Sequence, residues 1–213
     1  SAMLGRPGRD QDIEHYCQTL RNIGAAGIPI VCWGFAPLVG VVRTSRTTRT
    51  RGGALVTSFD YDLVKDAPLT EAGVVSEGKL WDNMRYFLER VIPVAEEAKV
   101  KMALHPDDPP ISPIRGVARI LRNVEAFDRV LELVPSDYNG LTFCQGCYAE
   151  MGVDIPETIR HFGDKIFFVH FRDVRGAVPK FEETFHDDGK TDMFAAMRAY
   201  REIGFEGPMR PDH

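Results

Sequence analysis

The sequence predicts an α/β fold built on a parallel sheet, either an open doubly wound sheet or a barrel. Short apolar runs, typical of buried strands, alternate along the chain with segments of helical periodicity. The expected strands lie at residues 28–35, 100–105, 141–144, 166–171 and 208–211. Because these runs are apolar almost throughout and helices separate them, the strands are expected to run parallel and to be buried on both faces.

Helical periodicity fills the segments between these strands. The strongest pattern covers residues 79–99, where Pro93 is expected to kink the helix because it lacks a backbone N–H. The other expected helices lie at residues 10–24, 117–121, 124–133, 155–162 and 193–203. Residues 36–76 show no such period and are expected to be mostly irregular, with one short strand at residues 54–60.

Composition places the chain among ordinary globular proteins. It has 213 residues, of which 44% are hydrophobic and 27% charged, enough for one domain with a sizeable core. A formal net charge of −5 argues against general binding to nucleic acid or to a membrane surface. No apolar run is long enough to cross a membrane, and no signal peptide is visible. The four cysteines suit a reducing compartment, so a cytoplasmic protein is expected.

Four of the expected strands end in, or run into, side chains of metal-ligand type. His105, Cys144 and His170 lie at the ends of three successive strands, and Asp212 follows the last one. Ligands bind at the carboxyl ends of the strands in parallel α/β folds, so these side chains are expected at one rim. Each alone is more often a core residue than a ligand, but their shared position favours a divalent metal site.

A CxxC motif accompanies one of these residues. Cys144 and Cys147 could form a redox pair or half of a zinc site. The sequence has no second CxxC, and no helix is expected to begin directly after the motif. We therefore interpret Cys144 as a metal ligand and Cys147 as a packing residue.

Several other polar residues are candidates at the same rim. Asp107 and Asp108 follow His105 and could orient its imidazole or form a simple turn. Arg172 could bind substrate or form an ion pair, and His186 could approach the rim or face solvent. We place Asp107 and His186 among the expected substrate-binding residues. His213 stands beside Asp212, where a histidine can act as general acid or base.

An arginine- and threonine-rich segment follows the first strand. Its arginines could recognise the carboxylate of an acidic substrate by paired hydrogen bonds, so we interpret the segment as a mobile lid. A solvated surface loop is the alternative interpretation. The arginines are Arg43, Arg46, Arg49 and Arg51.

Four sequence motifs together identify a family resemblance. They are HPDDPP from His105, FCQG from Phe143, VHFRD from Val169 and PMRPDH from Pro208. In this order and over nearly the whole chain, the sequence resembles the mannonate dehydratases. The resemblance implies a xylose-isomerase-like (β/α)8 TIM barrel, of which this chain holds about the last five strands.

The resemblance also implies an activity. Members of the family are lyases that convert D-mannonate to 2-keto-3-deoxy-D-gluconate in hexuronate (glucuronate) catabolism. Manganese is the expected metal, with Fe²⁺, Co²⁺ or Zn²⁺ as alternatives. The matching residues are His105, Cys144, His170 and Asp212 as metal ligands, His213 and Arg172 as catalytic groups, and Arg43 and Thr44 as substrate contacts.

Departures from the family leave alternatives open. Val41 and Val42 stand where the family usually has a tryptophan before the Arg-Thr pair. We expect residues 1–213 to form one incomplete catalytic domain, without three upstream strands and a C-terminal segment that carries a tyrosine. A sugar isomerase or epimerase on the same barrel, or a truncated non-catalytic relative, remains an alternative. The expected partner is a small sugar acid, and a homo-oligomer, dimeric or higher, is also expected.

Overall fold

A curled five-stranded parallel sheet forms the centre of the protein in this computed structural model, which describes residues 1–212. Its strand order is β1-β4-β5-β6-β9, and every neighbouring pair is parallel. The strands are β1 (Ile30–Gly34), β4 (Lys101–His105), β5 (Asn139–Cys144), β6 (Ile166–His170) and β9 (Met209–Arg210). The five strands predicted from the sequence and their parallel arrangement are confirmed.

Six α-helices connect and cover the strands. They are α1 (Arg9–Ala25), α2 (Glu77–Ala98), α3 (Val124–Leu133), α4 (Gln145–Met151), α5 (Ile155–Phe162) and α6 (Met193–Glu202). Short 3-10 turns occur at Ala2–Leu4, Arg51–Gly53, Tyr61–Leu63 and Gly163–Lys165. Four helices begin where a side-chain oxygen accepts the backbone N–H three residues on, which satisfies an otherwise unpaired donor. The capping residues are Ser76, Asn123, Asp154 and Asp192.

The helix predicted at residues 117–121 is wrong. Val117 instead forms β-bridges with Val75 and Ile114, and the backbone N–H of Ala118 donates to the Val75 carbonyl. The Arg119 guanidinium donates to the carbonyl of Val39 over 2.8 Å. A five-residue segment is too short to stabilise a helix by itself, so these long-range contacts decide its conformation.

A second sheet, antiparallel and four-stranded, was not predicted. It consists of β2 (Ser45–Arg49), β3 (Leu55–Asp60), β7 (Val174–Ala177) and β8 (Lys180–Glu183) in the order β2-β3-β8-β7. Only β3 coincides with a predicted strand, and the expectation of irregular structure across residues 36–76 is wrong for β2. The sequence of β2 contains no apolar residue, so it lacks the alternation that marks a half-buried strand.

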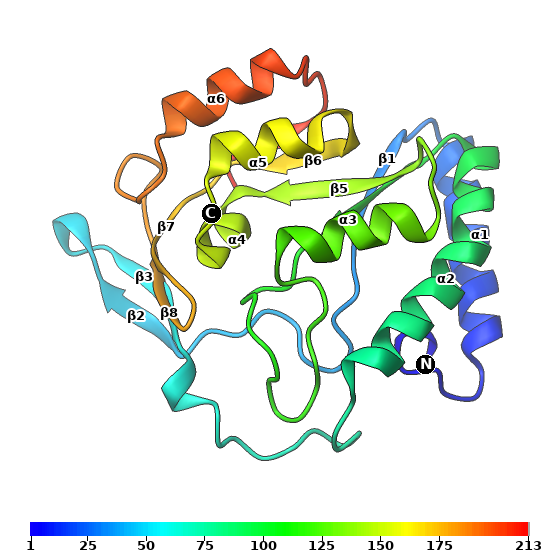
Figure 1. Ribbon diagram of the computed structural model, residues 1–213, viewed down its shortest axis with the longest axis horizontal. Coiled ribbons are helices and arrows are strands. Elements are labelled where there is room, and N and C mark those ends of the chain that lie inside the picture. The colour runs from blue at the N-terminus through cyan, green and yellow to red at the C-terminus, as the bar shows by residue number, and fades with distance from the viewer. Residues whose placement is uncertain (213) are drawn as a thin grey trace.

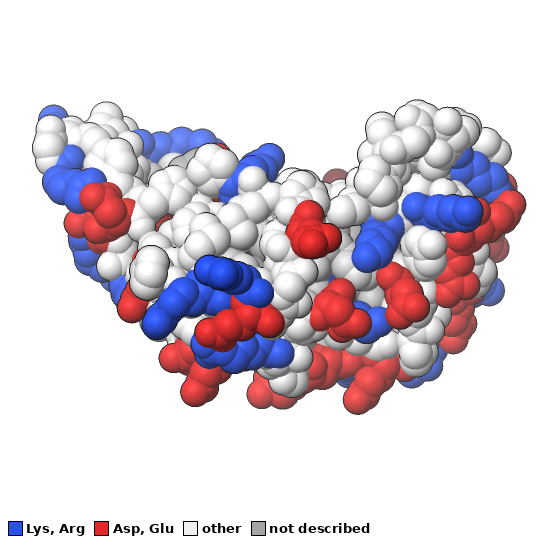
Figure 2. Space-filling model, turned by 90° about the horizontal axis from the view of Figure 1, so that it is seen from above, with Lys and Arg blue, Asp and Glu red and all other residues white. Residues whose placement is uncertain are grey.

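Figure 1 shows how the two sheets lie relative to the helices. β5, buried along its whole length, points toward α4 and the antiparallel sheet, whereas α1 and α2 pack together at the opposite end. Viewed from above, the molecule curves around a hollow lined mostly by uncharged residues, and charged side chains gather on the convex edge (Figure 2). A curled parallel sheet that does not close on itself is expected to leave an open inner side.

Candidate metal centre and its surroundings

The ends of three central strands bring the predicted ligands to one rim. In the strand register, Cys144 of β5 lies opposite His170 of β6, and His170 lies opposite Arg210 of β9, two residues before Asp212. His105 ends β4, the neighbour of β5 on its other side. The common direction of parallel strands is therefore enough to gather four residues that are far apart in the sequence.

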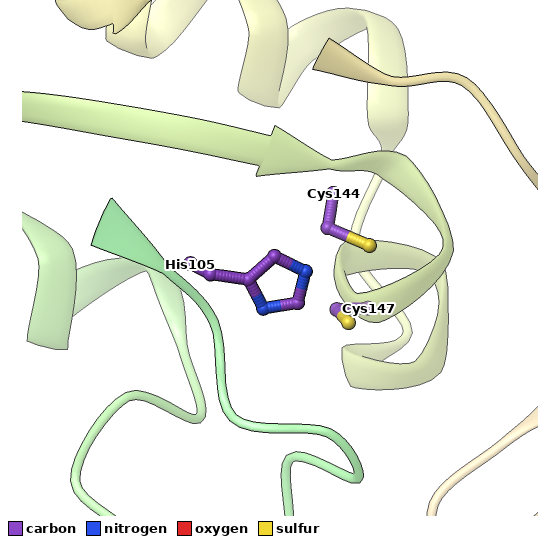
Figure 3. A group of neighbouring side chains, drawn as sticks. All are labelled: His105, Cys144 and Cys147. Carbon is purple, nitrogen blue, oxygen red and sulfur yellow. The ribbon is translucent and has the colours of Figure 1, made fainter. Parts of the chain in front are cut away.

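Cys144 lies at the centre of two overlapping groups of possible ligands. The donor atoms of Cys144, His170 and Asp212 all lie within 4.8 Å of one another, and so do those of His105, Cys144 and Cys147. Figure 3 shows the His105 ring directed toward the two sulfur atoms. The centroids of the His105 and His170 rings are 5.1 Å apart. The structure thus brings together all four residues predicted as ligands and adds Cys147 beside them.

The charges at this rim favour an ionised thiol. Burial by itself opposes ionisation of Cys144, but the hydrogen bond from Cys147 and the positive charges of Arg172 and His105 hold its pKa well below the ordinary value. Burial likewise disfavours the charged form of His170, yet hydrogen bonds to Cys144 and Cys32 raise its pKa to about 9. The pKa of His105 is also raised, against the effect of burial, chiefly by the charge of Cys144.

The donor set fits a divalent cation. The Nδ1 atom of His170 is buried and has no hydrogen-bond partner among the described residues, and it lies 3.6 Å from a carboxylate oxygen of Asp212. A thiolate, two imidazoles and a carboxylate supply the nitrogen, sulfur and oxygen ligands that transition metals accept. A cation at this point would give the unpaired imidazole nitrogen a partner.

Because a metal takes only the neutral imidazole, metal binding is expected to depend on pH. His170, with a pKa of about 9, carries a proton at pH 7 that a metal must displace. We expect the affinity for Mn²⁺ to rise between pH 7 and pH 9, by up to about tenfold per pH unit for each imidazole that loses a proton. Calorimetric titration in two buffers of different ionisation enthalpy measures the released protons. A His15→Ala variant, changed on exposed α1, should show the same slope, and a flat affinity would contradict this expectation.

A buried ion cluster adjoins these ligands. The Arg172 side chain is 1% exposed, and its Nε atom lies 3.3 Å from an Asp212 carboxylate oxygen. Its Nη atoms contact Asp108 at 3.1 Å, Glu150 at 3.2 Å and Glu183 at 3.0 Å. Of the two interpretations of Arg172, the structure shows the ion pair. Asp108, Cys147 and Glu150 also group as possible metal ligands, but this guanidinium contacts all three and already supplies their cation.

Arg43 belongs to the same cluster. Its side chain is 5% exposed and pairs with Asp108, and its Nη2 atom lies 2.6 Å from Glu183. The segment interpreted as a mobile lid contains strand β2 and the turn that follows it, so it belongs to the antiparallel sheet, and its role as a lid stays a prediction. The substrate contact proposed for Arg43 remains a prediction, although the guanidinium already meets two internal carboxylates.

Other predicted residues take different positions. Asp107 does not orient the His105 ring: its carboxylate accepts from Leu121 N and pairs with Arg119, whereas His105 Nδ1 lies 2.7 Å from the Pro106 carbonyl. The Thr44 hydroxyl accepts from the backbone N–H of Asp60 inside the antiparallel sheet.

The two remaining histidine candidates follow or flank the last strand. His186 does approach the rim, where its Nε2 atom lies 2.8 Å from the Pro211 carbonyl. His213, the predicted acid or base, lies outside the described residues.

Sequence reasoning missed Glu150, Glu183 and Cys32. The two glutamates complete the ion cluster. The Sγ atom of Cys32 lies 2.8 Å from the Thr142 hydroxyl, and this thiol is also hydrogen-bonded to His170. Glu150 lies three residues after Cys147, a spacing that places both on one helix face once α4 is known. No local pattern marks Glu183 or Cys32 as functional.

The prediction that no helix follows the CxxC motif is wrong. Helix α4 begins at Gln145, with Cys144 as its N-cap residue and Cys147 in its first turn. Gly146 and Arg172 are tightly packed, because a Cβ atom at Gly146 would overlap the guanidinium. Glycine at position 146 therefore leaves the space that the Arg172 side chain occupies beside α4.

Substitution of this glycine is expected to destabilise the protein. In Gly146→Ala the added methyl group displaces Arg172 from its carboxylates, and overpacking of this kind lowers the free energy of unfolding by about 1–3 kcal/mol. Gly78→Ala in α2 is the matched control, because its Cβ would meet nothing within 4 Å, and alanine favours helix. Urea unfolding of both variants measures the difference. Equal stability of Gly146→Ala and the wild type would contradict the proposed packing.

Comparison with known proteins identifies the family. The sequence model of the D-mannonate dehydratase family matches residues 2–74 and 69–213. The chain belongs to the mannonate dehydratase family. It is 39% identical over 247 residues to the mannonate dehydratase of Thermotoga petrophila, covering 99% of this chain and 68% of that one. The Enterococcus faecalis mannonate dehydratase is 39% identical over 245 residues, covering 98% of this chain and 68% of its own.

A solved structure agrees with this assignment. The crystal structure of mannonate dehydratase from Streptococcus suis superposes with a TM-score of 0.91 at 36% identity, covering 100% of this chain and 63% of that one. The chain thus spans less than two thirds of that solved relative. A D-tagatose 3-epimerase-like protein shares the fold alone, with a TM-score of 0.64 at 16% identity. The predicted fold class, an incomplete (β/α)8 barrel, is confirmed.

The alignment with the T. petrophila enzyme is longer than this chain. It runs over 247 positions, whereas this chain has 213 residues, so at least 34 positions (247 − 213) have no counterpart here. The two stretches matched by the family model meet at residues 69–74. That junction lies between β3 and α2.

Proposed function

We propose that this chain carries the metal-binding face of a D-mannonate dehydratase, which removes water from D-mannonate to give 2-keto-3-deoxy-D-gluconate in hexuronate catabolism. The convergence of Cys144, His170 and Asp212 at the strand ends, within a chain of this family, supports the proposal. His105 is proposed as the fourth ligand because its ring is directed toward Cys144 (Figure 3).

The reaction requires removal of a weakly acidic proton at C2 and departure of the C3 hydroxyl. When bound, a divalent metal supplies Lewis acidity at the substrate carboxylate and the C2 hydroxyl, where negative charge develops. His213 is proposed to move the C2 proton, and Arg172 to hold the Asp212 carboxylate in place from 3.3 Å. Burial by itself lowers the pKa of Arg172, but the charges of Cys144, Glu150 and Glu183 raise it well above the ordinary value, so the guanidinium stays positively charged.

The identity of the metal belongs to the proposal. Family membership and the donor set support a divalent cation, and we propose Mn²⁺ on the family resemblance. A thiolate ligand by itself favours softer ions, so Fe²⁺, Co²⁺ and Zn²⁺ are the alternatives. Metal content of the purified protein, measured with and without each added ion, distinguishes them.

An assay of the purified chain tests the activity. We expect D-mannonate to be consumed in the presence of Mn²⁺ and 2-keto-3-deoxy-D-gluconate to appear, with no product after removal of the metal by a chelator. Isomerisation or epimerisation of a neutral sugar, without dehydration of mannonate, would favour the alternative enzyme. Stoichiometric metal binding without turnover would favour a non-catalytic relative.

The remaining proposals concern the cellular location, the partner and the assembly of the protein. Among the described residues, no helix is both long and apolar enough to span a membrane. The four cysteines are too few for a disulfide scaffold and suit a reducing compartment, and we propose a cytoplasmic location. A small sugar acid is the proposed partner, and a homo-oligomer of two or more copies is the proposed assembly, which light scattering would test.

A further inference from the structure

The thiol of Cys147 has no part in the proposed reaction, yet it lies beside a proposed metal ligand. The sulfur atoms of Cys144 and Cys147 lie within 4.8 Å of each other, and the two thiols are hydrogen-bonded. Figure 3 shows both sulfur atoms on the side of α4 that faces the His105 ring. Contact between two thiols at this rim is a feature that packing alone does not require.

The surroundings of Cys147 are polar. Arg172 donates a hydrogen bond to its Sγ atom over 3.3 Å, and the atoms of Asp108 and Glu150 that could bind a metal lie within 4.8 Å of the same sulfur. A cysteine that only fills space in a core behaves as a small hydrophobe among apolar neighbours. By contrast, the thiol of Cys17, which is buried on α1, donates to a backbone carbonyl, that of Arg90, over 3.9 Å.

The local backbone suits a bond between these two residues. Cys144 is the N-cap of α4 and Cys147 lies in its first turn, so the three-residue spacing places both side chains on one side of the helix. The rings of Phe143 and Tyr148, which flank the pair in sequence, stack at a centroid distance of 4.3 Å and hold the turn in place. Redox-active CxxC pairs have the same spacing.

We propose that Cys144 and Cys147 form a reversible disulfide when no metal is bound, with a small peroxide as the oxidant. The Cys144 thiolate attacks hydrogen peroxide, which gives a sulfenic acid and hydroxide. The Cys147 sulfur then attacks that sulfenic acid, the S–S bond forms, and water leaves. In total, two thiols and one hydrogen peroxide give one disulfide and two water molecules. A small oxidant is required because both cysteines are fully buried.

The consequence for metal binding rests on the proposed function. A disulfide removes the Cys144 thiolate from the donor set, so the oxidised protein is expected to bind no divalent metal at this rim. A bound metal, in turn, occupies the same sulfur and is expected to protect the pair. Oxidation and metal occupancy would thus exclude each other, and reduction of the disulfide by a dithiol would restore the site.

Peroxide treatment of the metal-free, reduced protein tests the pair directly. We expect the thiols counted after denaturation to fall from four to two, with a cross-linked peptide that contains Cys144 and Cys147 and disappears with dithiothreitol. Cys17→Ser is the matched control and should lose two of its three thiols in the same way. Cys147→Ser should give no cross-linked peptide and should instead accumulate a sulfenic acid that dimedone traps at Cys144.

Two outcomes separate this inference from the proposed function. Absence of the Cys144–Cys147 peptide from the oxidised wild-type protein, or a cross-link to Cys32 in its place, would overturn the redox pair. Mapping uses the wild-type chain, so this result does not depend on the folding of a variant. If the disulfide forms equally fast in saturating Mn²⁺, the pair is supported, but Cys144 is not the metal ligand and the proposed function loses its site.

Discussion

A His170→Ala variant is expected to lose its bound divalent metal and, with it, any dehydration of D-mannonate. His170 lies within 4.8 Å of Cys144 and Asp212, and its buried Nδ1 atom has no hydrogen-bond partner among the described residues. Loss of a residue that merely supports a metal ligand weakens binding by about 10- to 100-fold, so loss of a ligand should exceed about 100-fold. Metal content after dialysis and a mannonate dehydration assay measure the two effects.

The matched control is another histidine that bonds to an aspartate. His161 contacts Asp128 over 2.7 Å on the exposed face of α5, with its side chain 48% exposed. His161→Ala is expected to retain metal and to keep the wild-type activity. Unchanged metal content in His170→Ala would contradict the proposed centre, whereas retained metal with lost activity would move His170 from the ligand set to another role.

An Arg172→Met variant is expected to be strongly destabilised. It leaves Asp108, Glu150 and Glu183 buried around the single guanidinium of Arg43. Burial and the charge of Asp108 already raise the pKa of Glu150 well above its ordinary value. Breaking a buried ion pair on one side lowers the free energy of unfolding by about 3–5 kcal/mol. In a chain of this size, that corresponds to a fall in Tm of about 10 °C.

Arg175 offers a control with similar chemistry at the surface. Its side chain is 50% exposed and pairs with Glu182 and Asp188. Solvent screens such pairs, so Arg175→Met should leave Tm close to that of the wild type. Thermal unfolding of the two variants in the same buffer gives the comparison. If Arg172→Met unfolds at the wild-type temperature, the carboxylates must protonate at little cost, and the buried ion pairs of Arg172 do not stabilise the fold.

The central sheet and the candidate ligands were predictable for the same physical reason. Apolar runs report burial on both faces, and parallel strands end at one edge, so residues such as His105 and Cys144 could be expected to meet from their strand positions alone. Helices α2 and α5 were predictable as well, because helical periodicity is a local property of the sequence.

The antiparallel sheet and the ion cluster were not predictable in this way. Arg43 and Glu183 are 140 residues apart, and Arg172 and Asp108 are 64 apart. The local sequence does not distinguish an arginine that binds substrate from one that pairs with a buried carboxylate. For that reason, only the structure shows that Arg43 pairs with buried carboxylates and that Ser45–Arg49 forms strand β2.

The sequence by itself determined the family, the five parallel strands and the rim at which Cys144, His170 and Asp212 converge, because periodicity and strand polarity act over a few residues. The tertiary structure decided which charges pair and that Cys147 meets Cys144 on a helix that the sequence did not suggest. Those contacts depend on where distant segments pack, and ion pairs across dozens of residues leave no repeating pattern in the chain.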